Sequence, residues 1–252
     1  MFRKKNKIKF LGVVPRVEGA IDPPVKASKA IPEWIKVIPN EQNNFPTAKR
    51  CLPLIEACSE GYVWKTHCDI EFEVAENEKG TYLSLNFYSG INHFAFDQGQ
   101  PIIGKHGDDQ INVDPQPLKE KIRLHGDNPW RQVYKFNNLF VVQTPKGYSC
   151  RFKSLSNSFN IPIQLFEGVV ETDHYYGCVN FPFRYTGPKT PHKYLLKKGT
   201  PLIQIIPFKR EKWESEVGTA DIDKVQKQQF FLTTVFRNAY RNQVKNNGNT
   251  KK

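Results

Sequence analysis

The sequence of 252 residues lacks both long hydrophobic runs and paired cysteines. No run approaches the roughly 18 apolar residues that a membrane helix needs, so we expect no bilayer-spanning segment. The apolar stretch after the basic start, residues 10–14, is also shorter than a signal peptide requires. The five cysteines are odd in number and irregularly spaced, which argues against a disulfide framework and against a paired metal site. Free thiols favour a reducing, cytoplasmic setting.

Common catalytic signatures are missing as well. The sequence contains neither a P-loop nor the Rossmann glycine pattern, so it carries no standard phosphate-binding loop. It has no H-x-E segment followed by C-x-x-C, which excludes a zinc deaminase site of that type. Any chemistry must therefore come from a less common arrangement of side chains.

Positive charge is concentrated at the two ends of the chain. The 37 Lys and Arg residues outnumber the 25 Asp and Glu residues, which gives a net charge of +12. Residues 1–50 and residues 224–252 each carry a net charge of +7, and the segment between them carries −2. Basic ends of this kind can contact nucleic acid phosphates or an acidic partner, or can serve as solvated tails.

The central part of the chain has the pattern of a mainly β protein. The whole sequence contains 38% hydrophobic and 13% aromatic residues, enough to form a core, which excludes wholesale disorder. From residue 62 onward, polar residues alternate with apolar or aromatic ones, the period of half-buried strands. Residues 89–128 are predicted to form loops with short strands. The other predicted strands are 62–66, 68–74, 81–87, 139–144, 148–152, 161–166, 178–183 and 202–207, the second and third of them forming a hairpin.

Helices are predicted only towards the two ends. Residues 31–35 and 47–59 indicate short helices, and residues 219–245 indicate a long one. The apolar stripe of that long helix, which we expect to dock on the body or on a neighbouring subunit, consists of Phe230, Phe231, Val235 and Phe236. We therefore expect a Pro-rich basic arm (1–50), a β domain (51–218) and a basic C-terminal helix and tail (219–252).

Three glycine turns between short apolar strands carry the residues best suited to chemistry. They lie at residues 145–148, at residues 168–177, which include Glu171 and Asp173, and at residues 198–200. A hydroxyl-rich segment, residues 154–158, follows the first turn. Turns rich in hydroxyl and N–H groups can cradle phosphate, and a loop carboxylate can bind Mg²⁺ or orient an attacking water.

In their order and spacing, these segments resemble the trimeric dUTPase and dCTP deaminase superfamily. The P-x-G-Y turn of that family matches residues 145–148, its G-V-I-D-x-D hairpin matches residues 168–173, and its K-G-D-R-I-A-Q-L strand matches residues 198–205. The resemblance covers about residues 139–208 and implies a compact, distorted β-barrel of the β-clip type.

The sequence segments IPEW, TPKGYS and KGTPLIQIIPF also resemble those of a family of proteins from tailed phages and bacteria. That resemblance implies that the protein is located in a bacterial or phage-infected host cell, or alternatively that it is associated with the virion.

The dUTPase resemblance implies catalytic roles for several carboxylates. Glu171 would orient the hydrolytic water. Asp69 and Asp173 would aid the binding of Mg²⁺ or of the sugar, which makes Mg²⁺ the implied cofactor. His174 stands where the family has a Tyr that packs against the sugar and base.

The same resemblance implies a phosphate-binding group. Ser156 falls on the Ser of the phosphate motif, and Gln204 falls on a Gln that the family retains. Lys153 and Arg151 lie close by in the sequence and would supply positive charge. Because the family builds its sites between three subunits, the resemblance implies a homotrimer that binds a nucleotide.

Several positions depart from the pattern of the family. Glu171 replaces an Asp, Leu155 and Pro201 replace two Arg, and no glycine-rich arm follows Arg210. The longer Glu side chain displaces its carboxylate, and positioned catalysis is sensitive to such a displacement. Nucleotide hydrolysis and a non-catalytic role in phage assembly or interaction, on the same fold, therefore both stay open.

A third alternative is an Fe(II) and 2-oxoglutarate oxygenase. His67 and Asp69 form an H-x-D pair on a predicted strand, and His174 would supply a second imidazole. Two imidazoles and one carboxylate leave open positions on iron, as this chemistry requires. Arg184 would then anchor the carboxylate of 2-oxoglutarate.

Overall fold

The computed structural model describes residues 6–13, 22–43, 45–78, 80–88, 134–136 and 138–231, and it confirms the mainly β prediction. The chain divides into two compact units. One consists of Met1–Glu33 with Cys58–Arg210, and the other of Trp34–Ala57 with Glu211–Lys252. The first unit contains the sheets on which the candidate residues lie.

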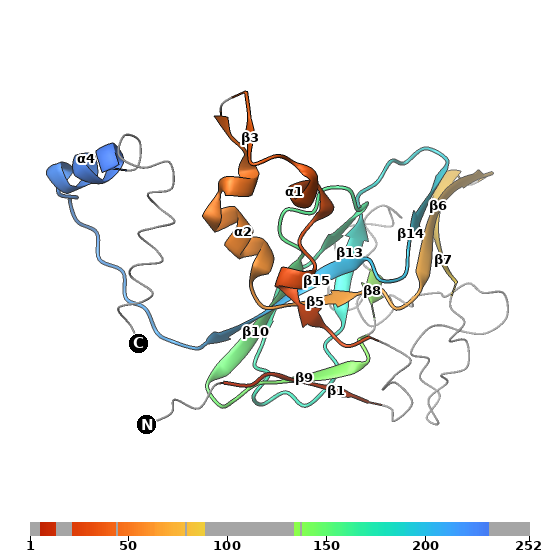
Figure 1. Ribbon diagram of the computed structural model, residues 1–252. Coiled ribbons are helices and arrows are strands. Elements are labelled where there is room, and N and C mark those ends of the chain that lie inside the picture. The colour runs from red at the N-terminus through yellow and green to blue at the C-terminus, as the bar shows by residue number, and fades with distance from the viewer. Residues whose placement is uncertain are drawn as a thin grey trace. The chain divides into compact units, whose positions relative to one another are not determined.

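Antiparallel sheets make up the first unit (Figure 1). The largest sheet has the strand order β12-β10-β15-β5-β2, two smaller ones have the orders β11-β13-β8 and β14-β6-β7, and β1 pairs with β9. Among the described strands, no sheet closes into a barrel. The bounds are β1 (Lys9–Gly12), β2 (Val25–Lys26), β5 (Tyr62–Lys65), β6 (Asp69–Asn77), β7 (Gly80–Tyr88), β8 (Tyr134–Phe136), β9 (Phe140–Gln143), β10 (Tyr148–Ser154), β11 (Ile163–Leu165), β12 (Gly168–Val170), β13 (Phe181–Tyr185), β14 (His192–Leu196) and β15 (Pro201–Lys209).

Helices and the remaining short strands are few among the described residues. They are η1 (Ala27–Lys29), α1 (Glu33–Val37), β3 (Glu41–Gln42), β4 (Phe45–Pro46), η2 (Ala48–Arg50), α2 (Leu52–Ser59) and α4 (Ile222–Phe230). The helix predicted over residues 47–59 is divided, because Cys51 is extended between η2 and α2. Pro53 lies in the first turn of α2, where its missing N–H leaves no helical hydrogen bond unmade.

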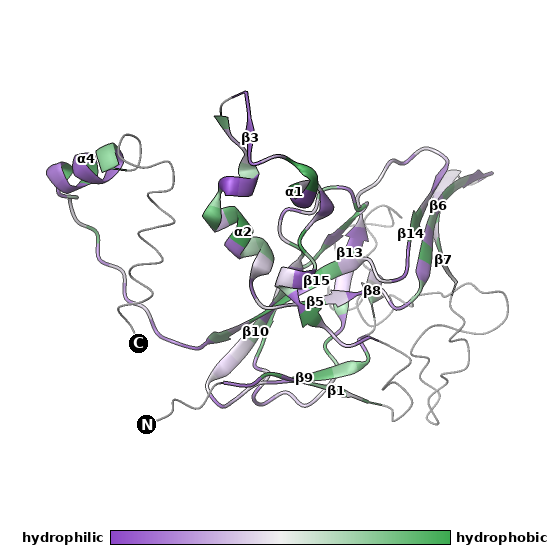
Figure 2. Cartoon of the chain, in the orientation of Figure 1, coloured by the Kyte–Doolittle hydropathy of each residue, from purple (hydrophilic) through white to green (hydrophobic). Residues whose placement is uncertain are grey.

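The alternating sequence of β6 explains how this strand packs. Ile70, Phe72 and Val74 are buried, whereas Glu71 and Glu73 on the opposite face lie 3.3 and 3.2 Å from the Lys193 ammonium. The predicted hairpin is confirmed, since β6 pairs with β7 along its whole length. Figure 2 shows hydrophobic and hydrophilic residues mixed along these two strands.

An aromatic cluster forms the centre of the first unit. The ring of Phe183 lies 4.2 Å from that of Phe136 and 5.6 Å from that of Tyr134, measured between centroids. Trp64 packs edge-on against Phe181 at 5.4 Å. Since aromatic side chains bury large apolar areas, these rings supply much of the hydrophobic stabilisation of the sheets.

Two strands lie at positions other than those predicted. The strand expected at residues 178–183 begins at Phe181, because Cys178 makes only an isolated bridge to Val141. The polar strand β14, which the sequence pattern does not indicate, pairs with β6, and Lys193 there contacts the β6 carboxylates.

The ends of the chain contribute more structure than an irregular arm. Within residues 1–50, β1 pairs with β9 and β2 pairs with β5. The C-terminal helix begins at Ile222, after Asp221 accepts the Lys224 N–H as its cap. Residues 219–221 of the helix predicted over 219–245 are not helical, because the helix begins only after its cap at Asp221. Residues 232–245, like the loops predicted at 89–128, lie outside the described residues.

Candidate functional site

Lys153, Ser156 and Gln204 form a hydrogen-bonded cluster, hereafter the phosphate cluster. The Lys153 ammonium donates to Ser156 Oγ at 2.9 Å. Ser156 donates to Gln204 Oε1 through its hydroxyl, at 2.9 Å, and through its backbone N–H, at 3.2 Å. Three of the residues predicted to bind phosphate are therefore brought together by the fold.

Strand pairing places these residues. In the β10–β15 register Lys153 lies directly opposite Gln204, and the chain turns after β10 at Asn157, which has a φ of 58°. Gln204 is fully buried, and its amide nitrogen donates to the Glu60 carbonyl at 2.8 Å. This bond fixes the orientation of the amide, so the side-chain oxygen faces Ser156 and can hold its hydroxyl in place.

Arg151 lies on the same face of β10 as Lys153, two residues earlier, and is exposed. Its cross-strand neighbours are Val169 of β12 and Ile206 of β15. The fourth residue predicted to bind phosphate thus lies beside the phosphate cluster along the strand, about 7 Å away.

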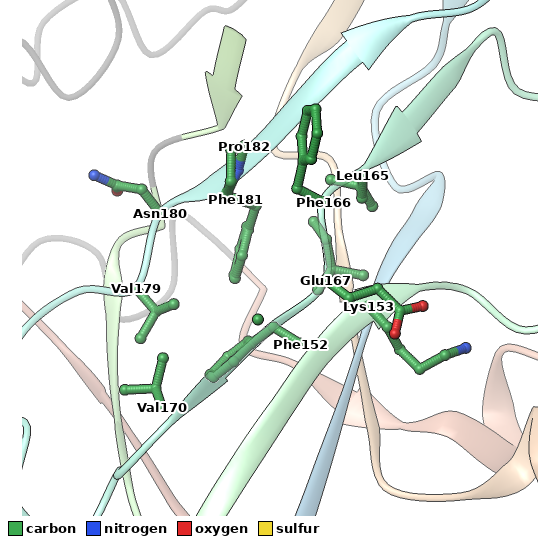
Figure 3. Close-up of a pocket in the computed structure, with 12 residues that line it drawn as sticks. Phe152, Lys153, Leu165, Phe166, Glu167, Val170, Val179, Asn180, Phe181 and Pro182 are labelled. Atoms are coloured by element: carbon green, nitrogen blue, oxygen red, sulfur yellow. The ribbon is translucent and has the colours of Figure 1, made fainter. Parts of the chain in front are cut away.

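An apolar cavity of about 210 Å³ adjoins β10 (Figure 3). Phe152 and Phe181 lie on two sides of it, with Val170 and Val179 beside them, as Figure 3 shows. Lys153 belongs both to its lining and to the phosphate cluster. The remaining lining residues are Leu165, Phe166, Glu167, Gly168, Asn180, Pro182 and Ile203.

Asp173 is held in a tight ionic contact at the other end of β10. The Arg210 guanidinium donates to both of its carboxylate oxygens, at 2.7 and 2.6 Å, and Gly147 N–H donates to one of them at 2.7 Å. The hydrogen bonds from Arg210, with that from Gly147, hold the pKa of the Asp173 carboxyl well below its usual range. Asp173 therefore joins the turn at 171–175 to the ends of β10 and β15.

Glu171, Asp173 and His174 offer ligand atoms that all lie within 4.8 Å of one another. The Arg210 guanidinium, however, binds both oxygens of Asp173 and lies 3.9 Å from Glu171. A cation already fills this position, and a second one would be repelled, so the residues in this arrangement do not fit Mg²⁺.

The phosphate cluster and the Asp173 turn are far apart in one copy of the chain. Gly147 contacts Asp173, and Lys153 contacts Ser156. Six residues of extended chain separate Gly147 from Lys153, a distance of about 20 Å. A water oriented by Glu171 therefore cannot reach a phosphate held by Ser156 of the same copy.

His67 and Asp69 occupy a third place in the fold. Asp69 Oδ1 accepts the Lys198 N–H at 2.6 Å, and the His67 ring packs edge-on against Trp64 at 4.7 Å. Among the described residues, the ligand atoms that gather with those of His174 belong to Glu171 and Asp173, and neither His67 nor Asp69 is part of that group.

Arg184, the predicted anchor for 2-oxoglutarate, instead donates to Gln164 on the neighbouring strand, with its Nε at 2.9 Å.

Acid is expected to destabilise the protein through His67. Burial, with a smaller contribution from Lys198, lowers the pKa of His67 from 6.5 to about 4, so the unfolded chain binds a proton in this window that the folded chain does not. Between pH 7 and pH 4 the wild type should lose about 3 kcal/mol of unfolding free energy through this residue. Urea unfolding at both pH values should show a smaller loss for His67→Leu, and an equal loss would contradict the assignment.

Arg210 is the residue that the sequence patterns did not single out. It follows β15, whose pairing with β10 sets Lys209 opposite Tyr148 and so brings Arg210 to the turn at Gly147. Its backbone N–H donates to the Gly147 carbonyl at 2.8 Å. A lone Arg after a strand gives no signal in sequence, because its partner Asp173 is 37 residues away.

None of the described helices is long and apolar enough to cross a membrane. Comparisons of the chain with models of known protein families, with curated proteins and with solved structures gave no match.

Proposed function

We propose that this chain binds a nucleotide, with its phosphates at the phosphate cluster and its base in the apolar cavity. The observation that carries the proposal is the meeting of Lys153, Ser156 and Gln204, which come from positions up to 51 residues apart. A lysine side chain on β10 and a hydroxyl on the turn that follows this strand are suited to an anionic ligand. Gln204 serves as the positioning residue that aims Ser156.

The volume and the lining of the cavity favour a planar ring as the part of the ligand that binds next to the phosphates. At about 210 Å³ it is smaller than the 300–1,000 Å³ of typical drug-sized pockets, so it suits a single ring system better than a whole nucleotide. Its walls include Phe152 and Phe181, which can stack on such a ring. Lys153 belongs both to the lining of the cavity and to the phosphate cluster, so the two adjoin at this residue.

The proposal extends to the arrangement of the sheets and to the assembly. We infer a β-clip arrangement like that of the dUTPase superfamily, supported by the mainly β fold and by the matched turns. Because the turn that holds Glu171 lies towards the opposite end of β10 from Ser156, hydrolysis would need Glu171 from a second copy at the phosphate. A homotrimer of the kind implied by the resemblance would supply it.

Calorimetric titration with each deoxynucleoside triphosphate tests the binding. We expect Lys153→Ala and Ser156→Ala each to weaken binding by about 10-fold or more, because a hydrogen bond to a charged group is lost. Lys146→Ala, which removes an exposed lysine near the other end of β10, is the matched control and should leave the affinity unchanged. Equal affinities for all four proteins, or no binding by the wild type, would refute the proposal.

A second candidate is a non-catalytic assembly protein on the same fold. The observation that favours it is Arg210, whose guanidinium occupies the position between Glu171 and Asp173 where a hydrolytic metal would be needed. Pyrophosphate release from nucleotides with Mg²⁺ tests whether a bound nucleotide is hydrolysed. Release that is lost in Glu171→Ala supports hydrolysis, whereas release no greater than that of the variant, together with no binding in the calorimetric titration, supports the assembly protein.

A further inference from the structure

The chain from Glu211 to Phe231 links β15 to α4 and includes α4 (Figure 1). Each residue of this segment is exposed. Trp213 is 87% exposed and Val217 is 98% exposed. Trp is among the residues that bury the most area in folded proteins and interfaces, so a nearly bare Trp four residues from a bare Val is a candidate binding surface. Among the described residues, none buries either side chain.

The charge of this segment narrows the choice of partner. Residues 211–223 contain five acidic residues and one basic residue, a net charge of −4, so the rest of the chain carries +16. A negative segment is repelled by nucleic acid and by acidic membranes, and it is attracted to a basic protein surface. On a second copy, the outer face of β12, β10 and β15 carries positive charge at the exposed Arg151.

The outer face of β12, β10 and β15 has the matching composition. Arg151 is exposed there between Val169, which is 57% exposed, and the half-buried Ile206. Phe208, two residues further along β15, is also half-buried. Exposed apolar area around a positive charge complements a segment in which Trp213 and Val217 flank Glu214 and Glu216.

We propose that residues 211–223 of one copy bind the outer face of β12, β10 and β15 on a second copy. Trp213 and Val217 pack against Val169 and Ile206, and Glu214 and Glu216 pair with Arg151. The inference does not depend on nucleotide binding, because it concerns how copies of the chain hold one another.

Sedimentation of the full-length chain over a range of concentrations tests the proposal. Trp213→Ala should weaken self-association by about 30-fold, the effect of removing an interface residue that contributes about 2 kcal/mol. Phe45→Ala is the matched control, since Phe45 is an exposed aromatic residue outside the segment, and it should have no effect. A monomeric wild type, or equal association of Trp213→Ala and wild type, would overturn the proposal.

Charge reversal tests the receiving face. Arg151→Glu alone, and Glu214→Lys with Glu216→Lys, should each weaken association, and the loss should depend on salt. The variant that combines all three substitutions should associate more tightly than either partial variant. If the combined variant is no better than the partial ones, the segment does not bind at Arg151, and this assignment of the face is wrong.

Discussion

Phe183→Ala is expected to lower the free energy of unfolding by about 3–5 kcal/mol. Phe183 is fully buried, and its ring lies within 6.4 Å of the rings of Phe72, Tyr134 and Phe136. Alanine would lose the transfer free energy of the ring and leave a cavity that β8 and β13 cannot both close. Because domains are stable by only about 5–15 kcal/mol, this one change should remove a large share of the total.

Urea unfolding monitored by circular dichroism measures this loss. Phe183→Leu is the matched control, because it keeps a large apolar side chain and should cost less than half as much as alanine. Arg184→Ala changes the exposed neighbour on the same strand and should cost only about 0.5 kcal/mol. A loss below about 1 kcal/mol for Phe183→Ala would show that the aromatic cluster is not the core.

Gly61→Ala is expected to be nearly as damaging, by at least about 3 kcal/mol, for a different reason. Gly61 has a φ of +72°, which disfavours any side chain, and a Cβ there would lie 2.2 Å from the Ile205 carbonyl oxygen. That oxygen belongs to the backbone of β15 and cannot move without disturbing the pairing with β5. The start of β5 would have to shift, together with the Glu60 carbonyl that holds Gln204.

Gly199→Ala separates the conformational cost of a positive φ from the steric cost of the contact with the Ile205 carbonyl oxygen. Gly199 has a similar φ of +82°, but a Cβ there meets no atom within 4 Å. We therefore expect Gly199→Ala to cost only about 1–2 kcal/mol, the conformational part alone. Thermal unfolding of both variants makes the comparison, and equal losses would show that the approach of Gly61 to Ile205 is not close in solution.

Local pattern was enough to predict most strands but not all of them. β6 alternates cleanly between core and surface, so its position follows from sequence alone. β14 contains His192 and Lys193 and pairs with β6, where the carboxylates of Glu71 and Glu73 lie 3.3 and 3.2 Å from the lysine ammonium. The formation of this strand depends on its tertiary pairing, which cannot be predicted from any short stretch of the sequence.

The candidate site, like the strands, could be predicted from the sequence only in part. Ser156 and Gln204 could be predicted to lie together, since the dUTPase resemblance assigns both to phosphate binding, and the β10–β15 register places Gln204 opposite Lys153. The role of Arg210 could not be predicted, because it depends on where β15 ends relative to the turn at Gly147. A catalytic carboxylate and a structural one look alike in sequence, and only the ion pair of Asp173 distinguishes them.

The pairing of β5 with β15 determines when the largest sheet can be completed during synthesis. Val63 lies opposite Gln204, 141 residues later in the chain. At the usual 5–20 residues per second, a ribosome needs about 7–30 seconds to make that interval. The β6–β7 hairpin is complete long before then, whereas β5 and β10 each wait with an edge unpaired. The nascent chain therefore exposes open strand edges for seconds, which makes it a client for chaperones until residue 209 has emerged.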